Sequence, residues 1–202
     1  MKRDWTPEQT EKRRMILDAA RDLFSKEGVN NVSMRRIAAK VNYSPALIYR
    51  YVKNKEELLD QLRSEGYQLL LNRMKRLEVN DDPIKHLTEL AVEYVTFGVE
   101  YWEYYDLMFH MPLQLASDGT VPVKGYEPVL AMLRNAVQSA INAGHFKNCP
   151  ADTAMFMCWS QVHGLLSLHI SGRTPFHAGE ERAKELLKEI PELFLRLASA
   201  TN

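Results

Sequence analysis

Cationic side chains are concentrated between Ser33 and Lys55, where they can bind phosphate groups. Guanidinium and ammonium groups pair with phosphate oxygens, and such contacts supply much of a protein's affinity for nucleic acid. Small residues in the second half of the stretch would also let the backbone approach a DNA groove. A solvated helix face, with Tyr49 in the core, is the alternative that these residue types leave open. The cations are Arg35, Arg36, Lys40, Arg50, Lys53 and Lys55.

Two short helices joined by a turn must position these side chains. Ser33 and Ser44 stand where N-caps are expected, because a serine oxygen can accept a hydrogen bond from an amide near a helix start. Pro45 follows as a first helical residue, where its missing N–H costs nothing. Asn42 and Tyr43 form the turn, since asparagine enters the left-handed conformation cheaply. The pattern predicts a helix-turn-helix.

The stretch resembles the DNA-binding domain of TetR-family transcriptional regulators. The usual family pattern has Ala-Gly-Val before the serine, where this chain has Val41-Asn42-Tyr43, and His-Phe after the tyrosine, where it has Tyr51-Val52. Ala46 stands where glycine is frequent and adds a methyl group at the implied groove contact. These departures lie at positions that would influence which DNA sequence the protein prefers. The resemblance itself rests on the order and spacing of Ile37-Ala38, Ser44, Ile48-Tyr49, Tyr51 and Asn54-Lys55-Glu56-Glu57-Leu58.

The resemblance implies a role for the matching residues. Phosphates would be contacted by Ser33, Tyr49 and Lys55. Base edges would be approached by Arg35, Tyr43, Pro45, Ala46 and Leu47. Phosphate contacts give affinity, and contacts to base edges give selectivity. The set predicted to bind DNA is completed by Arg36, Ser44, Arg50 and Tyr51.

A helix over residues 7–27 precedes this stretch and would brace it. Thr6 is placed as its N-cap with Gln9 three residues later, which is the capping-box arrangement. Gly28 would end the helix. Residues 1–54 are therefore predicted to form a three-helix DNA-binding head.

The rest of the chain, residues 55–202, is predicted to be a larger helical body, so that the fold class is all-α with about nine helices. A long helix from Lys55 to Leu77, capped by Asn54, would link it to the head. Pro191 should kink or divide the last helix. Further helices are expected over residues 82–103, 104–116, 127–143, 152–171 and 180–199. Loops are expected over residues 117–125 and 172–179.

Aromatic and methionine side chains are unusually frequent between Phe97 and Met111. Thioethers adapt their shape and phenols offer polar groups, so such a cluster suits a cavity for an apolar or aromatic ligand. For any single residue, a place in the core is the alternative. The predicted ligand-binding residues are Phe97, Tyr101, Trp102, Tyr105, Met108, Phe109, Met132, Met155, Trp159 and His163.

Residues 159–164, Trp-Ser-Gln-Val-His-Gly, resemble the Trp-x-x-x-His-Gly signature of the ligand-binding domain in one TetR subgroup. TetR-family bodies usually enclose a cavity for a small molecule, whose binding shifts the spacing of two heads. The resemblance therefore implies a ligand-responsive switch. His163 can hydrogen-bond a ligand, or it can be a buried histidine satisfied by a backbone carbonyl or by Trp159.

The predicted helix over residues 152–171 is apolar on most faces and must be buried on most faces. One small subunit cannot readily cover this much apolar surface. Pairing of this helix and the last one with their twofold copies is therefore predicted, in agreement with the resemblance. The predicted interface residues are Val162, Leu165, Leu166, Leu186, Leu193, Phe194 and Leu197.

The composition, with 46% hydrophobic residues and a formal net charge of zero over 202 residues, is that of a globular protein. Residues 1–60 hold 13 Lys and Arg against 9 Asp and Glu, whereas residues 61–202 hold 13 against 17. A basic N-terminal head on an acidic body is typical of a DNA-binding protein. The charged N-terminus lacks the apolar segment of a signal peptide, and no run of about 18 apolar residues exists. A cytoplasmic protein without a membrane partner is expected.

No catalytic residue, metal or cofactor is predicted. Cys149 and Cys158 form no CxxC pair and are expected to be reduced packing residues. The histidines show no i, i+4 pair with metal-ligand spacing, and no nucleophile elbow with an acidic partner is present.

The sequence thus predicts a dimeric repressor that binds a double-stranded DNA operator and is released by a small apolar or aromatic effector. Two alternatives stay open at this point. One is an architectural DNA-binding protein without a ligand. The other is an apolar-ligand-binding protein or enzyme that does not bind DNA.

Overall fold

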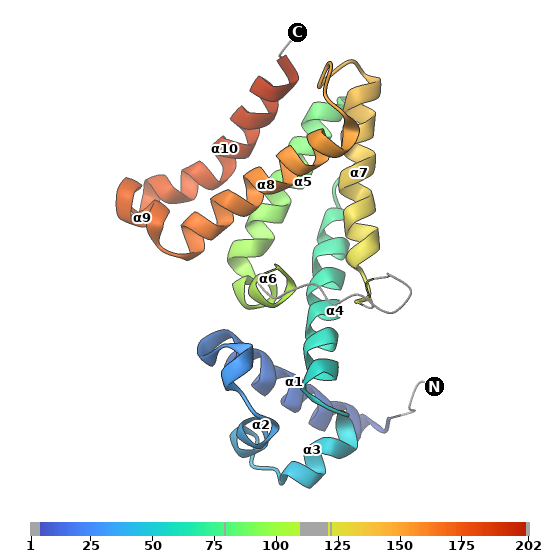
Figure 1. The fold of residues 1–202 in the computed structure, drawn as a ribbon, viewed down its shortest axis with the longest axis vertical. Helices are drawn as coiled ribbons and strands as arrows, with labels where there is room; N and C mark the ends of the chain where they lie inside the picture. Colours follow the sequence, from blue (N-terminus) through green and yellow to red (C-terminus); the bar gives the residue numbers. More distant parts are fainter. Residues whose placement is uncertain (1–4, 79, 110–120, 122, 201–202) are drawn as a thin grey trace. The chain divides into compact units, whose positions relative to one another are not determined.

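The computed structural model describes residues 5–78, 80–109, 121 and 123–200, and every regular element within them is helical. Ten α-helices and one 3-10 turn occur in these residues (Figure 1). This confirms the all-α fold class. The described residues group into two compact units, the first from residues 1–66 and 103–124 and the second from residues 67–102 and 125–202. The domain boundary after residue 54 stays a prediction.

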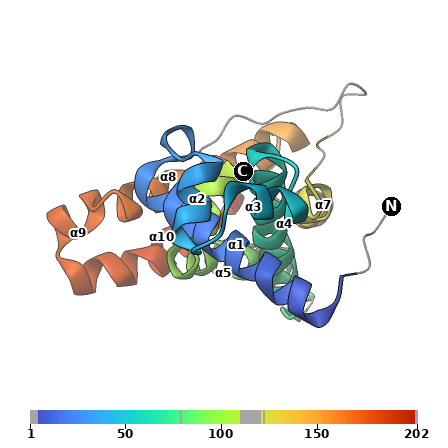
Figure 2. The same ribbon diagram turned by 90° about the horizontal axis from the view of Figure 1, so that it is seen from below.

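The first unit begins with a three-helix head. Helix α1 (Pro7–Glu27) is followed by a 3-10 turn, η1 (Val29–Asn31), and by the helices α2 (Met34–Lys40) and α3 (Pro45–Tyr51). Each of the three α-helices contacts the other two, and Figure 2 shows the short turn between α2 and α3. The expected capping box is confirmed: the Gln9 amide donates to Thr6 Oγ1, and the Thr6 amide donates to Gln9 Oε1.

The predicted caps of the helix-turn-helix are also confirmed. Ser33 Oγ accepts from the Arg36 amide and Ser44 Oγ accepts from the Leu47 amide, both at 3.2 Å. Asn42 has a φ of +56°, the left-handed conformation that the turn requires. The turn therefore redirects the chain after a single left-handed residue.

Helix α4 (Lys55–Met74) carries the chain from the first unit into the second, and the boundary between the units lies between Gly66 and Tyr67. The Glu57 amide donates to Asn54 Oδ1, which confirms the predicted cap. Helix α6 (Trp102–Phe109) follows α5 in the chain, and from its second residue onward it belongs to the first unit.

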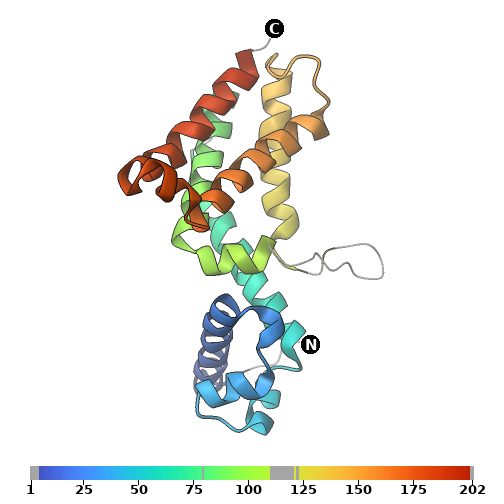
Figure 3. The same ribbon diagram turned by 60° about the vertical axis from the view of Figure 1, so that its left-hand side comes forward.

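The second unit is built on α5 (Pro83–Glu100). Helices α7 (Tyr126–Asn142), α8 (Ala151–Ile170) and α10 (Glu180–Ala200) all contact it, and α8 also contacts α7 and α10. Figures 1 and 3 show α8 crossing α5 and α7, with α10 running beside them. The core of this unit lies between α5 and the three helices around it.

The loop predicted near the end of the chain is wrong, and so is a division of the last helix at Pro191, whereas a kink at Pro191 stays a prediction. Residues 172–179 are not a loop, because they contain a short helix, α9 (Arg173–Ala178), at the corner where α8 turns into α10 (Figure 3). Pro175 is the third residue of α9, a position whose N–H would have no acceptor within the helix. Pro191 does not divide the last helix, since α10 runs through it. One lost hydrogen bond is offset there by the packing of α10 against α5 and α8.

Other predictions lie partly outside the described residues. These concern the helix expected over residues 104–116, of which α6 covers the described part, and the loop expected over residues 117–125. Met111 in the aromatic and methionine cluster also lies outside them.

The left-handed turn residue gives a test of the head. We expect Asn42→Val to destabilise the protein by roughly 1–2 kcal/mol, because a side chain with a Cβ branch clashes at positive φ. Asn42→Gly is the matched control and should retain or raise stability. Chemical denaturation followed by circular dichroism measures both, and equal stability of the two variants would contradict the assigned turn.

Candidate nucleic-acid interface and ligand-binding body

Helices α2 and α3 divide their side chains between the core of the head and its surface. Ile37 and Ala38 on α2 and Ile48 on α3 are buried, and they hold the two helices against α1. The predicted base-edge residues lie differently: Tyr43 and Leu47 are half-buried, whereas Arg35, Pro45 and Ala46 are exposed. The exposed start of α3 is therefore small and accessible, as a groove contact requires.

Two of the cations near α2 pair with acids of α1. Arg36 Nη2 lies 2.9 Å from Glu27 Oε1, and the pKa of Arg36 is raised by this contact. Lys40 forms an ion pair with Asp22. Arg35 is exposed and makes no ion pair or hydrogen bond with another described side chain. Arg35 is thus the α2 cation most accessible to an external anion, while Arg36 and Lys40 hold α2 on α1.

The ammonium group of Lys55 also makes its contacts within the head. Its ammonium group donates to the carbonyl oxygens of Val29 (3.0 Å) and Val32 (3.2 Å). These carbonyls belong to η1 and to the residue that follows it, just before the Ser33 cap. Lys55 therefore ties the start of α4 to the segment that leads into α2. The phosphate contact that the resemblance implied for Lys55 stays a prediction.

The two tyrosines at the end of α3 have different environments. Tyr49 is 52% exposed, whereas Tyr51 is only 6% exposed. The Tyr51 ring stacks on Trp5, with ring centroids 5.5 Å apart. We therefore assign Tyr51 to the core, and Tyr49 presents the exposed phenol. The three-residue spacing between Ile48 and Tyr51, one side of a helix, was the signal in the sequence for a buried ring. Arg50 is exposed and Ser44 acts as the cap.

A polar network that the sequence did not indicate joins α1, α4 and α6 within the first unit. Glu65 on α4 accepts hydrogen bonds from Arg14 (2.9 Å) and from the Tyr104 hydroxyl (3.0 Å). Arg21 on α1 donates to the same hydroxyl at 2.9 Å. Beside this network, a Cβ built on Gly66 would lie 2.5 Å from Met108 Sδ, so α4 and α6 are in close contact. Any displacement of α6 within this unit must therefore act on α1 and α4.

In the second unit, the predicted ligand residue His163 has a partner on α5. Its Nε2 lies 2.8 Å from the hydroxyl of Tyr94, which is 6% exposed. Trp159 lies one turn earlier on α8, with its ring centroid 5.5 Å from that of His163, and Phe156 stacks on Trp159 at 6.0 Å. A row of four rings thus runs from the surface of α8 to the buried Tyr94. Sequence reasoning missed Tyr94, which lies one turn before Gly98 on α5.

The other predicted ligand residues are distributed over both units. Phe97 and Met155 are buried in the second unit, and Tyr105 and Met108 are buried in the first. Burial raises the pKa of Tyr105 above its ordinary value. The half-buried residues are Tyr101, Phe109 and Met132, together with Trp159 and His163, and Trp102 is exposed.

The predicted dimer residues on α8 face inward. Val162, Leu165 and Leu166 are at most 6% exposed within one chain, so they belong to the core of the second unit. On α10, Leu186 and Phe194 are half-buried, whereas Leu193 and Leu197 are 45% and 60% exposed. The exposed apolar side chains of α8 are Phe156, Met157, Leu168 and Ile170. The sequence pattern did not distinguish these two sides of α8, because the helix is apolar on both, and the dimer interface itself stays a prediction.

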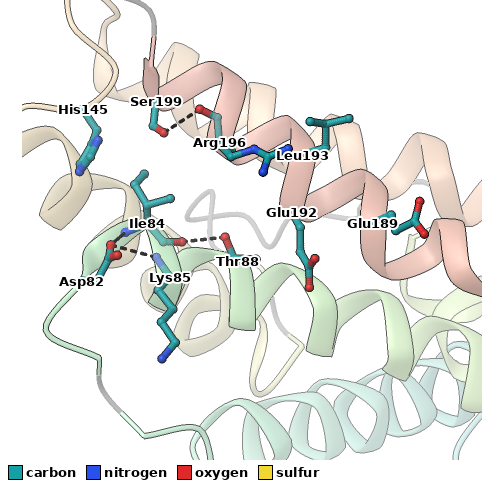
Figure 4. A pocket seen from close by; sticks show the side chains of 10 residues that line it. All are labelled: Asp82, Ile84, Lys85, Thr88, His145, Glu189, Glu192, Leu193, Arg196 and Ser199. Carbon is teal, nitrogen blue, oxygen red and sulfur yellow. Dashed lines mark hydrogen bonds between the residues drawn. The ribbon is translucent and has the colours of Figure 1, made fainter.

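An open groove of about 660 Å³ lies between the start of α5 and the second half of α10, with His145 at one end (Figure 4). None of the predicted ligand residues lines it. Its lining is strongly charged, and only Ile84 and Leu193 contribute large apolar side chains. Figure 4 shows Lys85 pointing away from α10, so the cations of the groove do not converge. The groove is therefore separate from the predicted ligand residues.

Among the residues that the structure describes, no group of three or more His, Cys, Asp and Glu side chains could hold a metal ion. Within the same residues, no helix is both long enough and apolar enough to span a bilayer. Both cysteines are free, with Cys149 half-buried and Cys158 buried.

Comparison with known proteins gives two matches to family profiles. Residues 16–62 match a profile described as bacterial regulatory proteins, tetR family. Residues 87–190 match one described as tetracyclin repressor-like, C-terminal domain. The first match covers most of the head and the second covers about half of the chain.

Individual relatives agree with these matches. The chain is 29% identical over 93 residues to YobS of Bacillus subtilis, an uncharacterized HTH-type transcriptional regulator, covering 46% of this chain and 49% of that protein. It is 24% identical over 153 residues to YhgD of the same organism, another such regulator, covering 73% and 78%. The crystal structure of the TetR-family transcriptional regulator PfmR from Thermus thermophilus shares the fold, with a TM-score of 0.72, 21% identity, and coverage of 90% and 97%.

The environments of the two cysteines predict different reactivity. Burial raises the pKa of Cys158 to about 12, so its reactive thiolate is scarce at pH 8. We expect iodoacetamide to modify Cys149 in the folded protein and Cys158 only after denaturation, as measured by peptide mass spectrometry. Rapid modification of Cys158 in the native state would contradict its role as a packing residue.

Proposed function

Because the chain belongs to the TetR family of bacterial regulatory proteins, we propose that it is a dimeric repressor released from its operator by a small apolar or aromatic ligand. The family is one of DNA-binding transcriptional regulators. The observation that carries the proposal is the capped helix-turn-helix, which presents the exposed, small-residue start of α3 within the segment that matches the family. We propose a cytoplasmic location and no enzymatic activity.

DNA recognition is proposed to centre on the exposed side of α2 and α3. Arg35, Pro45 and Ala46 would approach base edges, and Tyr49 and Ser33 would contact phosphates. All five are exposed, which supports this assignment. In a twofold dimer, two such heads would engage half-sites about one helical turn apart, roughly 34–36 Å.

Effector binding is proposed to involve the Trp-x-x-x-His-Gly segment on α8. Trp159 and His163 are half-buried beside Tyr94, which gives an apolar environment with one hydrogen-bonding pair. Such a site suits an apolar or aromatic molecule that carries a single polar group. The remaining aromatic and methionine residues of α5, α7 and α8 would supply the apolar lining.

Release of the operator is proposed to depend on the network around Tyr104. Its hydroxyl contacts both Glu65 on α4 and Arg21 on α1, so a shift of α6 would be transmitted to the head. A ligand needs to bind one head separation only a few kcal/mol more tightly than the other. A difference in affinity of that size moves most of the dimers into the state that the ligand favours.

Substitution of Arg35 tests the DNA-binding assignment. With operator fragments recovered from genomic DNA, we expect Arg35→Ala to weaken binding by about 1–3 kcal/mol and to relax selectivity. Arg36→Ala is the matched control, and a smaller loss of affinity is expected because Arg36 already pairs with Glu27. Fluorescence anisotropy at several salt concentrations measures both. Unchanged affinity in Arg35→Ala and in Tyr49→Phe would reject the assigned surface.

Tryptophan fluorescence tests the effector. A ligand found in a panel of apolar and aromatic metabolites should change the emission of Trp159 and lower operator affinity at the same concentration. The Trp159→Phe variant shows which part of the emission comes from Trp159, because Trp5 and Trp102 still fluoresce in it. A ligand that changes the emission of Trp159 and leaves operator affinity unchanged would reject the switch.

A further inference from the structure

The side chain of Lys55 is engaged within the head instead of extending into solvent. Lys55 is half-buried, and its Nζ donates to two carbonyl oxygens, of Val29 at 3.0 Å and of Val32 at 3.2 Å. Both valines are buried. An ammonium group has three donors, so two of them are already used. Hydrogen bonds from a charged donor are stronger than neutral ones, and moving Lys55 onto a phosphate would break two of them.

The position of Lys55 in its own helix is unfavourable for a cation. Lys55 is the first residue of α4, and the N-terminal end of a helix carries a partial positive charge. Glu56 and Glu57, which follow it, have the charge that this end favours. The two carbonyl oxygens carry partial negative charge, so their contact with Nζ offsets the cost of the lysine. The contact therefore gives a structural reason for a lysine at this position.

The two carbonyl groups lie where the chain enters α2. Val29 is the first residue of η1, and Val32 directly precedes Ser33, the cap of α2. Ion pairs bind α2 to α1, and Lys55 adds a contact from α4 at the start of α2. The entry to α2 is thus held by a helix that the ion pairs do not involve.

Arg35 is the exposed residue closest to this entry that is proposed to approach a base edge. It is the second residue of α2 and lies two positions after the Ser33 cap. A bidentate contact between an arginine and a base requires a fixed geometry. A change in the direction of the first turn of α2 would therefore weaken base recognition by Arg35.

We propose that Lys55 is a positioning residue for sequence recognition: its ammonium group holds the entry to α2 so that Arg35 is directed toward base edges. This role replaces the phosphate contact that the resemblance implies for Lys55. The inference rests on the proposed DNA-binding function and specifies how one part of that surface is held.

The Lys55→Met variant tests the proposal because it removes the donors and keeps a side chain of similar length. We expect it to weaken binding of an operator fragment recovered from genomic DNA roughly 10-fold, and binding of a scrambled duplex less than about 2-fold. The slope of log affinity against log salt concentration should stay nearly unchanged. Loss of a phosphate contact would instead weaken both duplexes and reduce that slope by about 0.9.

Lys53→Met is the matched control for the lost charge. Lys53 lies two positions earlier, and its exposed side chain makes no hydrogen bond or ion pair within the part of the chain that the structure describes. This variant should leave the ratio of operator affinity to scrambled-duplex affinity unchanged. Fluorescence anisotropy at several salt concentrations measures all of these affinities.

A double-mutant cycle with Arg35→Ala identifies the residue through which Lys55 acts. In the Arg35→Ala background, Lys55→Met should weaken operator binding less than about 2-fold, because the side chain that it orients is absent. Independent, multiplying losses in the two variants would overturn the proposal. A salt slope reduced by about 0.9 in Lys55→Met would overturn it as well.

Amide hydrogen exchange tests the contact without DNA. In Lys55→Met, the Arg36 amide, which donates to Ser33, should exchange roughly 10-fold faster. The Leu47 amide, which makes the equivalent bond to Ser44, is the internal reference and should change little. Equal changes at both amides would contradict the positioning role. A wild-type chain that binds neither duplex would reject the proposed DNA-binding function, and the exchange rates would still decide whether Lys55 holds α2.

Acetylation of the wild-type chain gives a measurement that does not depend on the folding of a variant. We expect acetic anhydride to modify Lys55 roughly 5-fold more slowly than Lys53, because the amine of Lys55 is hydrogen-bonded. A saturating operator fragment should leave the rate at Lys55 unchanged, as followed by peptide mass spectrometry. Strong protection of Lys55 by the operator would overturn the proposal.

Discussion

The close packing of α5 against α8 is the contact on which the second unit depends. Gly98 allows Leu166 to reach the backbone of α5, and one turn earlier the Tyr94 hydroxyl meets His163. Leu166 is fully buried as a result. Because this contact fixes the rotation of α8 about its own axis, it also decides which side chains of the helix are left outside. Phe156, Met157 and Leu168 are left exposed for this reason.

Helix starts were predictable because capping is local. Ser33, Ser44 and Asn54 each cap the helix that the sequence assigned to them, and Asn42 takes the left-handed conformation expected of it. Each of the three caps joins residues three positions apart, so it depends little on the rest of the fold. The helix-turn-helix could therefore be inferred from its own residues.

Features that depend on tertiary packing could not be predicted in the same way. Pro191 is a helix breaker by local rules, yet α10 continues through it while packing against α5 and α8. The side of α8 that is buried within one chain could not be predicted, because an apolar residue gives no direction when most of the helix is apolar. For Tyr51 the spacing from Ile48 indicates a buried side, but its stacking partner, Trp5, lies 46 positions away and could not be identified from the sequence. In each case the deciding contact is distant in sequence.

In the head, the ion pairs of charged side chains could not be predicted from the sequence either. The sequence shows that Arg35 and Arg36 are adjacent, but only the fold shows that Arg36 pairs with Glu27. Adjacent residues on a helix point about 100° apart, so one can brace the helix while its neighbour faces solvent. His163 and Gly164 repeat this division on α8, with one directed to Tyr94 and the other outward. Within a single turn of α8, one side chain is therefore committed to the core of the second unit while the next position is left at the surface.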